Sequence, residues 1–192
     1  MARVTDNALW YLGRGAGVSA LVLFTVTTAL GLLVAAGRPL PGLPRFAVTS
    51  WHRSASLSAL VFLLLHMVTL LTDPYAQLRL FDLVVPFAGR FRPLWQGLGT
   101  VAFDLVVVLV VTSLLRQRIG LRLWRTLHWA AYVMWPVAVL HVLGNGTDRR
   151  STWLEAIVAL CIATVVAAGV VRVAARRPRS VPVPPVGLGG LR

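Results

Sequence analysis

Five long apolar runs constrain this chain more than any other feature of its sequence. A helix needs about 20 mostly apolar residues to cross the hydrocarbon core of a bilayer. A soluble domain of 192 residues has no interior large enough for a chain that is 57% hydrophobic, so lipid must solvate these side chains. We therefore predict an all-α integral membrane bundle of about five transmembrane helices. The predicted helices cover residues 10–36, 44–71, 97–115, 121–143 and 153–173.

The five runs leave room for one domain, a transmembrane bundle over residues 1–175. Residues 176–192 are rich in arginine, proline and glycine. Such a composition lacks the apolar side chains that a packed core requires, so we expect a disordered basic tail. The single cysteine, Cys161, excludes a disulfide within the chain, and the absence of a CxxCH sequence argues against covalent c-type haem.

The net charge is +13 and comes entirely from arginine, because the sequence contains no lysine. The arginines cluster at the ends of the apolar runs, which indicates membrane topology and anionic lipid rather than nucleic acid as a partner. One predicted side of the membrane has many arginines and no acidic residue, and the positive-inside rule places it in the cytoplasm. A multi-pass plasma-membrane protein follows, with its N-terminus outside and its C-terminus in the cytoplasm. The arginines on the predicted cytoplasmic side are Arg38, Arg45, Arg53, Arg116, Arg118, Arg122, Arg125, Arg172, Arg176, Arg177, Arg179 and Arg192.

All four histidines fall on two of the five predicted helices. His52 and His66 are fourteen residues apart on the second, and His128 and His141 are thirteen apart on the fourth. Both helices run from inside to outside, so the histidines pair by depth as His52–His128 and His66–His141. At 1.5 Å per residue, the two pairs lie about 20 Å apart along the helices. That separation suits two haems stacked across the membrane.

Imidazole is a good axial ligand for haem iron, and ionisable residues inside a membrane usually have a function. Two imidazoles fill both axial positions, which favours electron transfer over substrate binding. Three other interpretations remain open. The histidines are packed polar or interfacial residues, they line a metal-ion transporter or permease, or the chain is a haem-free scaffold subunit. Zinc or copper ligation within a helix would prefer spacings of three or four residues, and no such pair exists.

The thirteen-residue spacing poses a geometric problem. At about 100° per residue, His66 points about 40° away from His52, whereas His141 points about 140° away from His128. Pro136 lies between the latter two and removes a helical hydrogen bond to Tyr132. We expect a kink at Pro136 to re-aim His141.

Three arginines are candidate partners for haem propionates, because arginine binds carboxylates bidentately. Arg14 lies near the external end of the first helix, and Arg53 and Arg125 flank the inner histidines. The alternative is that Arg14 reaches out to the membrane surface and the other two are simple topological anchors. Asp104 is a candidate partner for Arg14, or for His66 through a hydrogen bond to its ring.

The order of these motifs resembles the ferric reductase-like transmembrane domain family, in particular its short actinobacterial members. This family includes iron reductases, NADPH oxidases and the membrane haem subunit of the bacterial periplasmic methionine-sulfoxide reductase system. Histidine pairs fourteen and thirteen apart on two helices are its hallmark. The local strings that agree lie at residues 10–14, 51–53, 65–66, 92–95, 123–129, 140–141 and 146–148.

The resemblance implies two b-type haems held by the four histidines, with FMN or a quinone as further cofactors to consider. The sequence contains no GxGxxG and no region able to form a soluble flavin or NAD(P)H domain. We therefore expect an oxidoreductase component that receives electrons from a cytoplasmic flavin reductase or membrane quinol. The expected acceptor is an external or periplasmic protein, or ferric iron.

Overall fold

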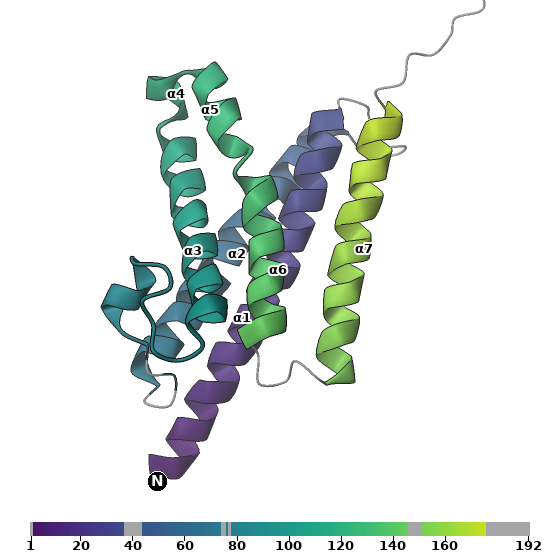
Figure 1. Ribbon diagram of the computed structural model, residues 1–192. Helices are drawn as coiled ribbons and strands as arrows, with labels where there is room; N and C mark the ends of the chain where they lie inside the picture. Colours follow the sequence, from purple (N-terminus) through teal and green to yellow (C-terminus); the bar gives the residue numbers. More distant parts are fainter. Residues whose placement is uncertain (1, 37–43, 74–75, 77, 146–150, 176–192) are drawn as a thin grey trace, which may run out of the picture.

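The computed structural model describes residues 2–36, 44–73, 76, 78–145 and 151–175, and every regular element in them is helical (Figure 1). Five spans are long and apolar enough to cross a membrane. The prediction of an all-α membrane bundle with five crossings is thus confirmed, and the predicted tail at 176–192 lies outside the described residues. The spans are α1 (Ala2–Ala36), α2 (Arg45–Thr72), α3 (Pro93–Leu114), α5 (Leu121–His128) with α6 (Ala131–Asn145), and α7 (Thr152–Ala175).

Proline sets the start of two helices. Pro44 is the N-cap of α2, as the sequence suggested. The third helix begins at Pro93, four residues before the predicted start at Gly97, because proline is well suited to the first position of a helix. Arg92 turns the chain into α3 with a left-handed backbone (φ 44°), and its Nη1 donates to the Gly144 carbonyl at the end of α6 (3.0 Å).

Short elements join the spans at both ends of the bundle. A 3₁₀ turn, η1 (Leu80–Leu83), lies between α2 and α3. The four-residue helix α4 (Arg116–Ile119) connects α3 to α5. Gly120 follows with φ 80°, a left-handed conformation that glycine adopts without steric cost, and this allows α5 to turn back.

The fourth crossing is broken just after His128, whereas the predicted kink at Pro136 stays a prediction. The Trp129 and Ala130 amides bond to carbonyls only three residues back, which ends α5, whereas α6 runs through Pro136 without interruption. The Arg172 guanidinium of α7 lies 5.4 Å from the Trp129 ring centroid and 5.5 Å from that of Tyr132. Its Nη1 also donates to the Tyr132 hydroxyl (2.7 Å), so α7 fixes the break.

The bundle is organised around α1, which packs along α2 and α7, while α3 packs along α6 (Figure 1). The two histidine-bearing crossings, α2 and α5–α6, do not pack extensively against each other. The core joins α1 to α6 through Trp135, whose Nε1 donates to Thr25 Oγ1 (2.9 Å). Both residues are buried, so this polar contact adds direction to the apolar packing of Leu21 and Phe24.

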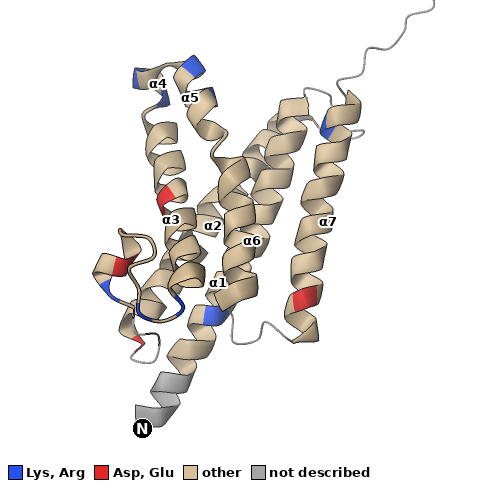
Figure 2. Ribbon diagram, in the orientation of Figure 1, with Lys and Arg blue, Asp and Glu red and all other residues tan. Residues whose placement is uncertain are grey.

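Charge divides the described residues between the two ends of the bundle (Figure 2). The end formed by α4 and the start of α5 has arginines and no acidic side chain among the described residues; we refer to it as the arginine side. The opposite end, the loop side, contains arginines together with Asp73, Asp82 and Glu155. This two-sided distribution matches the one predicted from sequence.

Candidate functional site

The histidines nearer the loop side, His66 and His141, are each anchored to the backbone of a neighbouring helix. His66 Nδ1 donates to the Gly13 carbonyl of α1 (2.7 Å), and His141 Nδ1 donates to the Trp95 carbonyl of α3 (2.7 Å). A carbonyl only accepts, so the proton must be on Nδ1, which leaves Nε2 with a free lone pair. Both rings are half-buried. We call them the loop-side pair.

The arginine-side pair is His52 and His128, whose ring centroids lie 6.5 Å apart at an interplanar angle of 67°. His52 Nδ1 donates to the Thr27 carbonyl of α1 (2.9 Å). His128 Nδ1 is buried and has no hydrogen-bond partner among the described residues. Its ring instead stacks on Trp124 at 4.9 Å, and the Trp124 Nε1 donates to Ser113 Oγ (3.3 Å).

The donor set fits haem. An imidazole–metal bond is about 2 Å long, so two rings on opposite sides of one ion have centroids about 6 Å apart. The His52–His128 separation of 6.5 Å agrees with this spacing. The described residues contain no group of three or more His, Cys, Asp or Glu side chains that would hold a metal ion by themselves. Pairs of facing imidazoles suit a metal whose other ligands come from a macrocycle.

The predicted charged partners occupy varied environments. Arg14 is half-buried, with its guanidinium 5.6 Å from the centroid of the Trp10 ring. Arg53 and Arg125 are exposed, next to the arginine-side pair in sequence. The hydrogen bond considered between Asp104 and the His66 Nδ1 is not formed, because the Gly13 carbonyl takes that position.

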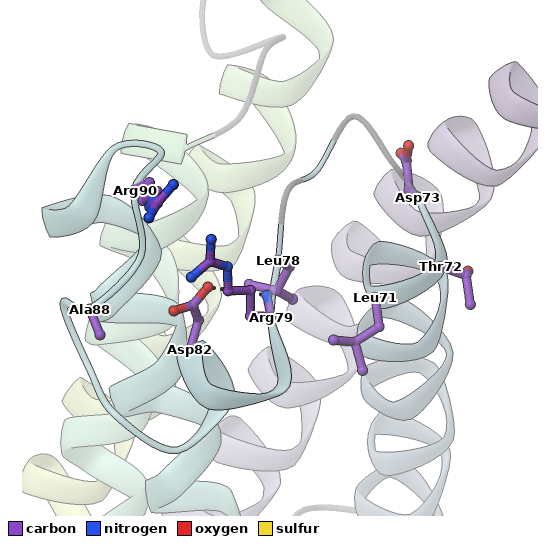
Figure 3. A pocket seen from close by; sticks show the side chains of 8 residues that line it. All are labelled: Leu71, Thr72, Asp73, Leu78, Arg79, Asp82, Ala88 and Arg90. Atoms are coloured by element: carbon purple, nitrogen blue, oxygen red, sulfur yellow. Dashed lines mark hydrogen bonds between the residues drawn. The ribbon is translucent and has the colours of Figure 1, made fainter.

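A cavity of about 490 Å³ opens on the loop side between the end of α2 and the η1 segment (Figure 3). Asp82 shapes its wall, since its Oδ2 accepts from the Arg79 amide (3.1 Å) and its carbonyl accepts from Thr100 Oγ1 (2.7 Å). Sequence patterns did not predict this cavity, because residues from two separate elements form it. It is lined by Leu71, Thr72, Asp73, Leu78, Arg79, Asp82, Ala88 and Arg90.

Fold and site together define a multi-pass helical membrane protein in which the His52 and His128 rings lie close together, with His66 and His141 farther along the same two crossings. Residues 16–139 match the family model described as ferric reductase like transmembrane component. This match covers well over half of the chain, and the protein belongs to that family, whose transmembrane domains generally bind haem. The matched segment includes His52, His66 and His128 and ends two residues before His141. Neither the curated proteins nor the solved structures contain a match.

Proposed function

We propose that this protein transfers electrons across the membrane through two b-type haems, one held by each histidine pair. The observation that supports this most is the pairing itself. His52 of α2 and His128 of α5 face each other with 6.5 Å between ring centroids, and three of the four rings have Nδ1 committed to a backbone carbonyl. If the histidines were only packed polar residues, nothing would require them to leave Nε2 unprotonated or to lie at similar depths on the two crossings.

Bound haem supplies one-electron redox chemistry. The chain's own histidines would hold the group, His52 with His128 and His66 with His141, and a haem held by two histidines would pass electrons rather than bind substrate. The Nδ1 hydrogen bonds of His52, His66 and His141 fix the tautomer and orientation of those three imidazoles. Arg53 and Arg125 on the arginine side, and Arg14 on the loop side, are the candidate partners for propionates, because guanidinium pairs bidentately with carboxylate.

The charge distribution supports a direction. We assign the arginine side to the cytoplasm by the positive-inside rule, which places the N-terminus outside and the C-terminus inside. Electrons then enter from a cytoplasmic flavin reductase or membrane quinol, with FMN or quinone as the mobile carrier. They leave on the loop side to an external protein or ferric iron. The cavity beside Arg79 and Arg90 opens there and is a candidate docking place for the acceptor.

A metal-ion permease is the less supported alternative, because the described residues lack a group of three metal-binding side chains along any path. The haem-free scaffold offers no reason for histidines at matched depths.

The experiment is electron transfer into sealed vesicles. Purified protein in liposomes with enclosed ferricyanide is exposed to external dithionite, and the enclosed ferricyanide absorbance is followed. We expect bleaching with the wild type and background rates with empty vesicles. His66→Ala is the matched variant, because it keeps the arginine-side pair while interrupting the path. Equal rates for wild type, His66→Ala and empty vesicles would overturn the proposal.

A further inference from the structure

Three of the four histidine rings rest on the same local arrangement of a neighbouring helix. In each, a backbone carbonyl accepts the Nδ1 hydrogen, and the residue four positions later is a glycine in contact with, or close to, the same ring. The three sets are Gly13 carbonyl and Gly17 with His66, Thr27 carbonyl and Gly31 with His52, and Trp95 carbonyl and Gly99 with His141.

Helix geometry explains why glycine stands four residues after the carbonyl. A helical Cβ leans toward the N-terminus and covers the preceding turn, including the carbonyl four residues earlier. Glycine leaves that carbonyl open to a ring from another helix. A Cβ added at Gly99 would lie 2.6 Å from His141 Cε1, and one at Gly17 would lie 2.8 Å from His66 Nδ1. At Gly31 the nearest His52 atom would be 3.4 Å away, an ordinary contact.

The arrangement repeats along α1 with the period of the histidines on α2. Gly17 and Gly31 are fourteen residues apart, as are His52 and His66. Because α1 and α2 run in opposite directions, the later glycine serves the earlier histidine. The same alignment of α1 against α2 therefore places a glycine beside the histidine at each end of α2.

His128 is the exception, and the corresponding position of α3 is not a glycine. Thirteen residues beyond Gly99, matching the His128–His141 spacing, the chain has Thr112 in place of a glycine. The Thr112 hydroxyl donates to the Val108 carbonyl (2.7 Å), so the carbonyl that corresponds in register to that of Trp95 already accepts a side-chain hydrogen bond.

We infer that Gly17 and Gly99 are positioning residues that give the His66 and His141 rings access to backbone carbonyls, so that Nδ1 stays protonated and Nε2 is presented to the haem, whereas Gly31 has room for a methyl group. This inference rests on the proposed function. The two glycines act through the histidines and touch no reacting atom themselves. The effect of an added methyl group should follow the closeness of the missing Cβ, with Gly99 most sensitive, then Gly17, then Gly31.

The first arm measures haem content and the reduced low-spin spectrum of alanine variants. Gly99→Ala and Gly17→Ala should each lose one of the two haems, the one held by the loop-side pair, while Gly31→Ala keeps both. Gly15→Ala is the matched control on α1, since a Cβ there meets nothing within 4 Å. Alanine is the better helix former, so this control should keep wild-type stability and both haems. Loss of haem from Gly15→Ala, or none from Gly99→Ala and Gly17→Ala, would overturn the inference.

The second arm is a double-mutant cycle on thermal stability of the haem-free protein. Gly17→Ala should lower the melting temperature in the wild type and have little effect in His66→Ala, where no ring meets the added methyl group. Equal destabilisation in both backgrounds would mean that Gly17 serves helix packing alone. This arm needs no haem. A wild-type protein that binds no haem would contradict the proposed function. The double-mutant cycle would still show whether Gly17 leaves room for the His66 ring.

Discussion

The two histidine pairs are built differently, although they sit on the same two crossings. In the loop-side pair both rings are tied to carbonyls, one of α1 and one of α3. In the arginine-side pair only His52 is tied in this way, and His128 relies on the Trp124 ring. Backbone carbonyls in a packed helix hold a fixed position, whereas an aromatic face leaves a ring free to rotate in its plane. We therefore expect a rigid loop-side site and a more adaptable arginine-side site.

Their position along the chain reinforces the contrast. His141 lies well inside α6, while His128 is the last residue of α5, next to the break that α7 fixes through Arg172. A ligand at the end of a short helix moves when that helix moves. In the proposed direction of transfer, the adaptable site faces the side on which the electron donor arrives.

Removing a ligand should have the largest effect and should separate the two sites. His66→Ala or His141→Ala should remove the loop-side haem alone, and His52→Ala or His128→Ala the arginine-side haem alone. Within a pair, the second substitution should add little, because the two ligands act as one unit. Haem stoichiometry and redox titration of the variants measure this. The pairing by depth is wrong if His52→Ala and His66→Ala lose the same haem.

Removing the stacking partner should have an intermediate effect confined to the arginine side. Trp124→Ala deletes the ring on His128, and such aromatic contacts contribute about 1 kcal/mol, or about fivefold in haem affinity. Trp124→Phe keeps the ring face and should retain most of that affinity. Haem release during dilution in detergent reports the difference. Release of the loop-side haem instead would contradict the contrast drawn between the two pairs.

The break in the fourth crossing should give the smallest effect. Tyr132→Phe removes the hydroxyl that Arg172 bonds but touches none of the four histidines, so it should shift the spectrum of the arginine-side haem only slightly. Pro136→Ala is the comparison. Since α6 passes through Pro136 unbroken, this variant should leave both haem spectra unchanged. A change in the loop-side spectrum from Pro136→Ala would show that the proline, rather than the break after His128, orients His141.

Hydropathy was enough to predict the number of crossings, because the cost of exposing polar backbone to lipid leaves few alternatives. It placed the α3 start too late, since the segment before Gly97 is less apolar and only Pro93 marks the boundary. The break at 129–130 was not predicted, and the Trp129 ring beside it contacts Arg172, a residue distant in sequence.

The histidine spacing predicted which rings share a depth, and the structure brings His52 and His128 together. It did not predict what orients the rings. Every residue has a backbone carbonyl, so residue types do not reveal which carbonyl accepts the Nδ1 hydrogen. The glycine four residues later is the local sequence feature that accompanies it. The Gly17–Gly31 interval equals the His52–His66 interval, and this equality could have predicted which glycines face the histidine rings.

The most direct test of the central claim is the haem content of the purified wild-type protein, with its dithionite-reduced spectrum. Cells supplied with haem should yield a red protein with low-spin b-type bands and two haems per chain, since each pair of imidazoles fills both axial positions of one iron. A colourless preparation that remains folded, or one with a five-coordinate high-spin spectrum, would contradict the claim.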